Sequence, residues 1–274
     1  MSAPLSQTNN PIILEKLFAR IQQEGGVMLQ SKMEGFSVPI LTHSFWTSRQ
    51  RQASSLHEVS YRACFKPQLP AFFIEALSEI GQSVYDPFSG RGTTPIEAAL
   101  RCRHIVANDI NPLSPILYRP RLFPPVLEEL EIRLNHIKWD NSLKAELDLS
   151  MFYHEKTLRE LLSLRCYLQE KKALNQEDHV DQWIRMVASN RLSGHSPGFF
   201  SVYSLPPNQA VLPERQRKIN RERNQTPTYR PVAELILKKS RQLLRDVNEQ
   251  VRRILAQASD DALILCGNAT ATPQ

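Results

Sequence analysis

The feature that most constrains the fold is a pair of short apolar runs within residues 82–109, each of which ends in an acid. The first run, QSVYD, is typical of a buried strand, and after it come the turn SGRGTTP, the helix IEAALRC and a second strand, HIVAND. Pro95 falls near the predicted start of the helix, where its missing N–H costs least. The segment therefore predicts two parallel strands joined by a helical crossover.

The turn between these strands is suited to a small zwitterionic ligand. Gly90 and Gly92 allow positive φ and a close approach of the backbone, while Asp86 can pair with a cationic group. Asp109 ends the second strand about 20 residues after the turn begins, where a carboxylate can accept hydrogen bonds from both ribose hydroxyls of an adenosine. The turn matches neither GxGxxG nor the phosphate loop that ends in GK[ST], so phosphate binding is disfavoured.

Helical patterns dominate the rest of the chain. Residues 1–60 predict a helix at Ile12–Glu24 and then a polar loop at Thr42–His57, and LPAFFIEALSEI predicts a helix before the first strand. Beyond residue 113 we expect proline-rich loop and four amphipathic helical stretches, at Val126–Leu147, His154–Lys172, Asp178–Leu192 and Pro231–Ala258. A loop of about 38 residues joins the last two stretches, and DALILCGNAT predicts a third strand.

Composition excludes several classes of protein. The apolar fraction of 41% is ordinary for a globular chain, and no apolar run approaches the roughly 20 residues that span a bilayer. The four cysteines form no CxxC pair and the seven histidines show no metal-ligand spacing. The opening MSAPLSQTNNP has no signal-peptide pattern. We therefore expect a cytoplasmic protein with neither a membrane nor a metal partner.

The net charge of +6 is concentrated in one stretch, because residues 214–253 hold twelve Lys or Arg against five acids. Such a stripe is expected of a protein that approaches a phosphate backbone, since neutralised phosphates release counterions. A solvated helix face explains the charge equally well.

The glycine turn and its flanks closely resemble the DNA amino-methyltransferases, which methylate cytosine N4 or adenine N6 with S-adenosylmethionine. Their cofactor motif is similar to DPF-G-GTT, and FKPQLP upstream and NDINP downstream extend the resemblance over residues 57–118. It is present again at residues 261–271. The resemblance implies an α/β fold with a Rossmann-like methyltransferase sheet, interrupted by a large, mainly helical insertion.

The resemblance also implies cofactor contacts. In the turn these are Asp86, Pro87, Phe88, Ser89, Gly90, Gly92, Thr93 and Thr94. Lys66 and Pro67 match a Lys-Pro pair beside the cofactor's methionine end, Asp109 would hold the ribose, and Ile110 would lie beside the adenine. Asn268 stands where the family often has the acid of a Gly-Asp-Ala turn, and its side-chain oxygen can still accept a hydrogen bond.

The family's catalytic turn, (Ser/Asp/Asn)-Pro-Pro-(Tyr/Phe/Trp), is not found in the sequence. That turn orients the amine of a flipped-out base toward the methyl group. Pro124-Pro125 in LFPPV and Pro206-Pro207 in SLPPN lack both the polar residue and the aromatic, and we expect both pairs to be loop prolines. We assign no catalytic residue and expect the chain to be inactive alone.

Four parts are therefore expected. Residues 1–60 form a helix and loop, 61–118 the S-adenosylmethionine-binding core, 119–260 a helical insertion that contacts double-stranded DNA, and 261–274 the third strand of an incomplete sheet. The candidate DNA contacts are Arg215, Arg217, Lys218, Arg221, Arg223 and Arg230. Because three of an expected seven strands are present, a second polypeptide supplying the catalytic half is a further expected partner.

Two alternatives remain. An RNA guanine-N2 methyltransferase has a similar DPF-G-G turn followed by IEA and DINP, although TTPIEA and FKPQLP favour DNA. A catalytically empty DNA-binding or partner subunit would explain the absent catalytic turn directly. The choice between cytosine and adenine depends on a base pocket that the sequence does not reveal.

Overall fold

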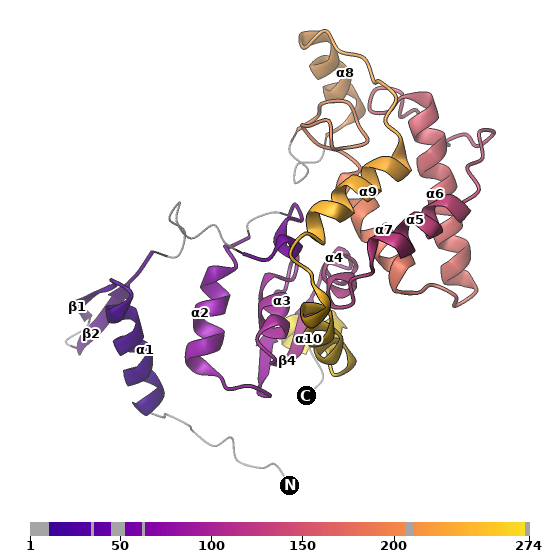
Figure 1. The fold of residues 1–274 in the computed structure, drawn as a ribbon. Coiled ribbons are helices and arrows are strands. Elements are labelled where there is room, and N and C mark those ends of the chain that lie inside the picture. Colours follow the sequence, from indigo (N-terminus) through magenta and orange to yellow (C-terminus); the bar gives the residue numbers. More distant parts are fainter. Residues whose placement is uncertain (1–10, 34–35, 45–52, 62–63, 206–210, 272–274) are drawn as a thin grey trace.

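The structure is a computed structural model, and it describes residues 11–33, 36–44, 53–61, 64–205 and 211–271. Within these residues the fold is mixed α/β, with ten α-helices and two small sheets. The N-terminal helix and hairpin lie at one end of the molecule, the larger sheet lies at the centre, and α8 projects at the far side (Figure 1). No helix of the described part is both long and apolar enough for a membrane span.

The central sheet confirms the predicted strand–turn–helix–strand unit. Its strands are β3 (Ser83–Asp86), β4 (His104–Asp109) and β5 (Leu263–Cys266). They pair in the order β3-β4-β5, all parallel, and the crossover helix between the first two is α3 (Thr93–Leu100). Because the strands are parallel, the acids that end β3 and β4 lie at the same edge of the sheet.

The outer strands of this sheet are far more exposed than the middle one. Ile105 and Ala107 of β4 are buried, whereas Tyr85 of β3 is 49% exposed and Leu263 of β5 is 50% exposed. Within the described part, β3 pairs with β4 alone and leaves its other edge open. Parallel strands normally have neighbours and covered faces, so this sheet has the pattern of a larger one.

Helices surround the sheet and share its core. The remaining ones in this region are α4 (Leu113–Leu122), α5 (Leu127–His136), α6 (Glu155–Ala173), α7 (His179–Arg191), α9 (Val232–Leu243) and α10 (Glu249–Asp260). One apolar cluster runs from Ile96 and Ile105 beside the sheet to Trp183 and Ile236 in the helices. The indole N–H of Trp183, fully buried, donates to the Ser240 hydroxyl at 2.9 Å. The helices and the sheet thus share one apolar core.

The N-terminal part forms a small unit of its own. It consists of α1 (Pro11–Gln23), the antiparallel strands β1 (Val27–Met33) and β2 (Phe36–Thr42), and α2 (Gln68–Leu77). Leu17 and Ile21 of α1 pack on Phe72 of α2, and Arg20 donates to Glu75 at 2.8 Å. Helix α1 agrees with the predicted Ile12–Glu24 helix, but the hairpin was not predicted, because its residues lack a clear two-residue alternation.

Several predicted boundaries after residue 110 are wrong. The stretch Val126–Leu147 is helical only to His136, since Ile137 is already extended. The single stretch Pro231–Ala258 is two helices, with Asn248 accepting from Val251 N as the cap of the second. The proline-rich segment after residue 112 contains α4. Pro115 lies in its first turn, where no N–H is needed, and Pro120 lies inside the helix near its end.

The predicted 38-residue loop is also partly wrong, since it contains α8 (Pro213–Glu222), which begins with proline at its first position. Pro124 and Pro125 lie in non-helical backbone between α4 and α5, as predicted. The second pair, Pro206 and Pro207, lies outside the described residues.

Candidate functional site

The glycine turn lies directly after β3, and two of its residues depend on glycine. Gly92 has a φ of 82°, and a Cβ there would meet Tyr118 Cβ at 2.1 Å. Gly90 has a φ of 52°, and a Cβ there would lie 3.2 Å from Tyr61 Cε1. The amide of Phe88 donates to Asp86 Oδ1 at 3.0 Å, which bends the chain back at the end of the strand.

Asp109 fastens this turn to the end of β4. One carboxylate oxygen accepts from the Gly90 amide at 2.7 Å, and the other accepts from the Asn111 amide at 2.9 Å. Ser89 adds two bonds to the Asn108 carbonyl, from its amide at 2.9 Å and its hydroxyl at 3.0 Å. Each carboxylate oxygen of Asp109 keeps a second lone pair, so the group can still accept hydroxyl donors.

Apolar side chains border the turn and the end of β4 without being buried. Phe88 is 76% exposed in the turn itself, and Ile110, 74% exposed, and Leu113 follow β4. These apolar side chains are therefore accessible to a ligand at this edge of the sheet. Pro87 and Thr94 are half-buried, and Thr93 is buried at the start of α3.

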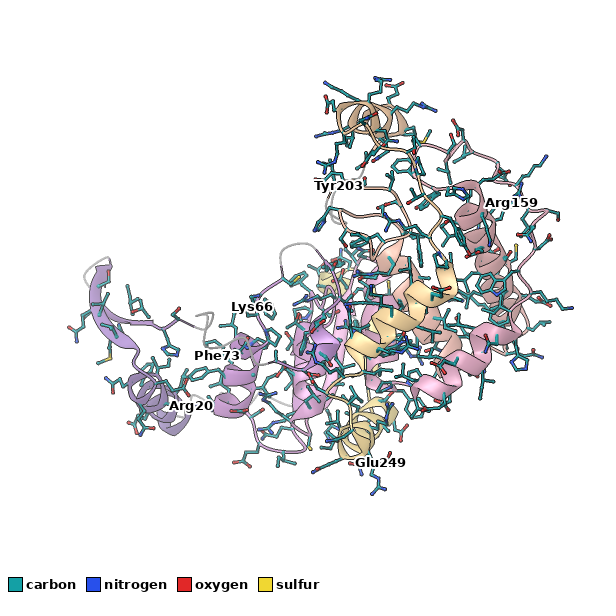
Figure 2. All side chains as sticks on the ribbon, turned by 45° about the horizontal axis from the view of Figure 1, so that its top comes forward. Arg20, Lys66, Phe73, Arg159, Tyr203 and Glu249 are labelled. Carbon is teal, nitrogen blue, oxygen red and sulfur yellow. The ribbon has the colours of Figure 1, made fainter. Side chains whose placement is uncertain are left out.

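The remaining candidate cofactor residues lie on neighbouring elements. Asn268 follows β5, and its side-chain oxygen accepts from the Thr270 amide at 3.1 Å and from its hydroxyl at 3.0 Å. The preceding Gly267 amide donates to the Asp109 carbonyl at 3.1 Å, which holds this turn beside β4. Pro67 is buried at the start of α2, and Lys66, exposed, precedes it (Figure 2). The structure thus joins the turns after β3, β4 and β5 through hydrogen bonds.

Tyr61 is a site residue that the sequence did not identify. Its ring packs against Gly90, and its hydroxyl accepts from Asn111 Nδ2 at 3.1 Å. The tyrosine therefore touches both the glycine turn and the segment after β4. The only sequence signal was its position just upstream of FKPQLP, which no periodicity distinguishes from an ordinary loop aromatic.

Two arginines fix the loop at residues 56–59 under the turn. Arg121 is fully buried and donates to the carbonyls of Leu117 at 2.9 Å and Leu56 at 2.7 Å, and also to that of Arg91. Arg91 in turn donates to the carbonyls of His57 at 3.1 Å and Val59 at 2.9 Å. Burial, and then the neighbouring Arg91, lower the pKa of Arg121 to about 9. Backbone carbonyls therefore replace a carboxylate as its partners.

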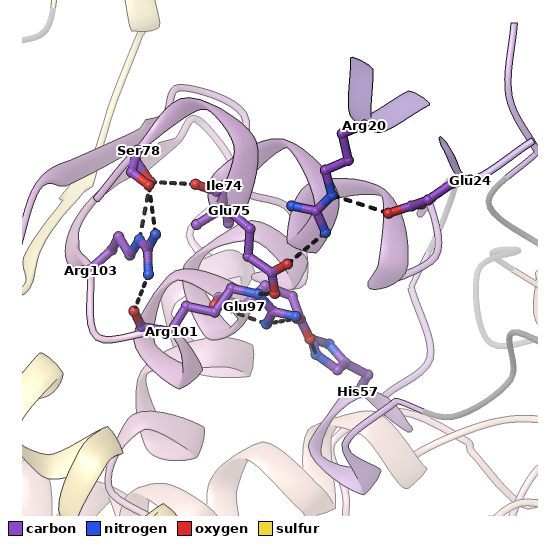
Figure 3. Close-up of polar contacts among 9 residues, drawn as sticks. All are labelled: Arg20, Glu24, His57, Ile74, Glu75, Ser78, Glu97, Arg101 and Arg103. Atoms are coloured by element: carbon purple, nitrogen blue, oxygen red, sulfur yellow. Dashed lines mark hydrogen bonds and ion pairs between the residues drawn. The ribbon is translucent and has the colours of Figure 1, made fainter. Parts of the chain in front are cut away.

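A chain of hydrogen bonds and ion pairs leads from this loop to the N-terminal unit. His57 Nε2 lies 2.5 Å from Glu97 Oε1, Glu97 also pairs with Arg101, and Glu75 joins Arg101 to Arg20 (Figure 3). Burial lowers the pKa of His57 despite the hydrogen bond to Glu97 that favours its charged form. The chain ties α1, α2 and α3 together behind the glycine turn.

The candidate DNA contacts lie away from this site and are not equivalent. Four of them are on α8, and Arg223 and Arg230 follow that helix. Arg217 pairs with Asp148 at 2.8 Å, and Lys218 lies 3.8 Å from Glu222 on its own helix. Arg230 is half-buried and donates to the Pro197 carbonyl at 2.6 Å. No group of His, Cys, Asp and Glu in the described part is arranged to hold a metal ion.

Comparison with known proteins gives one family and one relative. Residues 30–113 match the family model described as DNA methylase. The chain is 29% identical over 98 residues to the "Type II methyltransferase M.MvaI" of Kocuria varians, an alignment that covers 35% of this chain and 20% of that protein. The chain thus spans about a fifth of this relative's length, and no solved structure matches it. The segment that carries the glycine turn is similar to the DNA methylase family, and the predicted resemblance to the DNA amino-methyltransferases is confirmed.

Proposed function

We propose that this chain carries the S-adenosylmethionine-binding portion of a DNA methyltransferase, which transfers a methyl group to the exocyclic amine of cytosine (N4) or adenine (N6). The observation that carries this proposal is the hydrogen bond from the Gly90 amide to Asp109 at the carboxyl edge of the parallel sheet. It joins the carboxylate that would hold the ribose to the glycine turn. The sheet itself we interpret as the central part of a Rossmann-like methyltransferase sheet.

The chemistry of the site fits a nucleoside with a charged amino-acid end. Asp109 would accept the ribose hydroxyls, Ile110 and Phe88 would cover the adenine, and Asp86 with Lys66 would face the amino and carboxylate groups of the methionine end. Asp86 and Asp109 end β3 and β4, with Phe88 and Ile110 in the segments that follow, whereas Lys66 lies on another element, just before α2. When bound, the cofactor supplies an electrophilic methyl group, and the residues of this chain bind and orient it.

An active enzyme built on this chain would need a catalytic turn from another source, because no polar-Pro-Pro-aromatic sequence occurs within residues 1–274. The open edge of β3 supports this proposal, since a further parallel strand added there would end beside the glycine turn. The same missing turn is the observation that favours a second candidate function, a DNA-binding subunit without turnover.

Calorimetric titration with S-adenosylhomocysteine tests the cofactor site. We expect binding by the unaltered chain and at least tenfold weaker binding by Asp109→Asn, because neutralising the acceptor weakens two hydrogen bonds that are each worth about 1.5 to 3 kcal/mol. Asp260→Asn at the exposed end of α10 is the matched control and should bind normally. Equal affinity for the Asp109 variant would remove Asp109 from the site.

A methyl-transfer assay separates the candidate functions. Duplex DNA and guanine-containing RNA are offered to the chain alone and together with a polypeptide that contains a (Ser/Asp/Asn)-Pro-Pro-aromatic turn. Transfer to DNA only in the mixture supports the split enzyme. Transfer to RNA would support the guanine-N2 alternative, and cofactor binding without transfer to either would support the subunit without turnover.

A further inference from the structure

Helix α8 is attached to the rest of the molecule in an unusual way. Of its ten residues only Gln216 is buried, and none of its apolar side chains enters the core. Most helices in proteins owe their stability to an apolar face packed on a core. A helix without such a face is ordered here by polar contacts, and its outer surface stays free for a partner.

Three side-chain amides make that attachment. Gln216 and Gln225 each donate to the Tyr203 carbonyl at 2.9 Å and to Asn220 Oδ1 at 2.8 Å. Asn220 then donates to the Met151 carbonyl at 2.8 Å, which anchors the group to the loop before α6. The helix is therefore held in one orientation through its inner side, and its Arg215 and Arg221 are exposed.

The cations of α8 divide into two groups. Arg217 and Lys218 have acidic partners within the chain, whereas Arg215 and Arg221, both exposed, have no acidic partner among the residues that the structure describes. Arg223 stacks on the ring of Tyr203 with its guanidinium carbon 3.8 Å from the ring centre. Stacking fixes the plane of the guanidinium while its N–H groups remain free to donate.

We propose that α8 is the helix with which this protein reads duplex DNA, inserted into the major groove with Arg215, Arg221 and Arg223 as its contacts. The inference rests on the proposed function and specifies its DNA-binding part. An α-helix with its side chains is about 10 to 12 Å wide, and the major groove of B-form DNA is about 12 Å wide. Helix α8 projects from the rest of the molecule (Figure 1).

Charge complementarity favours DNA over an acidic protein as the occupant. Arginine donates two parallel hydrogen bonds to guanine O6 and N7 or to a phosphate, and both kinds of acceptor lie in and beside the major groove. The deep, narrow major groove of double-stranded RNA does not admit a helix. The proposal therefore requires preference for duplex DNA over duplex RNA.

The experiment measures binding of the full chain to a fluorescent DNA duplex between about 50 and 200 mM salt, the range in which phosphate contacts dominate the change in affinity. Arg215→Gln and Arg221→Gln should each reduce the slope of log affinity against log salt by about 1. Arg223→Gln should weaken binding, and Arg253→Gln on α10, which removes an exposed arginine paired with Glu249, should change nothing.

The outcomes distinguish this inference from the proposed function. Unaltered DNA binding by all three α8 variants would overturn the role of α8 while leaving a DNA methyltransferase in place. Equal competition by duplex RNA of the same sequence would overturn insertion into the major groove. If the unaltered chain binds S-adenosylhomocysteine but no DNA, both α8 and the DNA part of the proposed function fail, whereas the cofactor site stands.

Discussion

The glycine turn and α8 are both proposed to contact ligands, yet they are built in opposite ways. The turn is held against the core by tight packing of Gly92 on Tyr118 and by the fully buried Arg121. Helix α8 is fixed from one side by the amides of Gln216, Asn220 and Gln225. The turn proposed to hold one small molecule is embedded in the core, whereas the helix proposed to reach a large partner lies outside it. Substitutions in the two regions should therefore differ sharply in their effect on stability.

The largest effect is expected at Gly92. Gly92→Ala places a methyl group 2.1 Å from Tyr118 Cβ and also requires a left-handed conformation at φ 82°. The conformational cost is about 1 to 2 kcal/mol and the overpacking about 1 to 3 kcal/mol, so the free energy of unfolding should fall by about 2 to 5 kcal/mol. Urea denaturation measures the change.

Gly81→Ala provides the control for this prediction. Gly81 has the same φ of 82°, but nothing lies within 4 Å of the added Cβ. The free energy of unfolding of Gly81→Ala should fall only by the conformational cost, about 1 to 2 kcal/mol. Equal losses at the two glycines would show that the turn is not held by its packing on Tyr118.

An intermediate and pH-dependent effect is expected at Lys239 of α9, whose side chain is buried within 3.9 Å of Glu58. Burial, and then Arg191, lower its pKa to about 8 from 10.5. The unfolded chain therefore binds more protons between about pH 8 and 10.5, so this lysine makes the protein more stable as the pH rises through that range. Below pH 8 its buried charge opposes folding by roughly 2 to 3 kcal/mol.

Lys239→Met should abolish this pH dependence and stabilise the protein at neutral pH, as thermal denaturation at several pH values would show. Lys238→Met, at the exposed neighbouring position, is the control and should leave the profile unchanged. A Lys239 variant with an unaltered slope between pH 8 and 10.5 would mean that the lysine does not titrate in the folded protein near pH 8.

The contrast between the two regions also explains what the sequence could predict. The strands and the turn around Asp86 and Asp109 were predictable because apolar runs, glycines and acids follow one another within 30 residues. The roles of Arg121 and Tyr61 depend on groups up to 65 residues away in the sequence, and no local pattern encodes them. Helix α8 was missed because its mostly polar residues lack an apolar stripe, which is the usual signal of a helix.

The smallest global effect is expected for the amides that hold α8. Gln216→Leu removes two donated hydrogen bonds but keeps the side-chain volume, and Gln225 still donates to the same two acceptors. The free energy of unfolding should therefore fall by about 1 kcal/mol or less, while the amides of residues 213–223 exchange with solvent faster than in the unaltered chain. Hydrogen exchange measured by mass spectrometry reports both the stability of the core and the local opening of α8, with α7 as the internal reference. Faster exchange throughout the chain would show that α8 unfolds together with the core. The helix would then have a structural role, and its exposed cations would give no support to DNA binding.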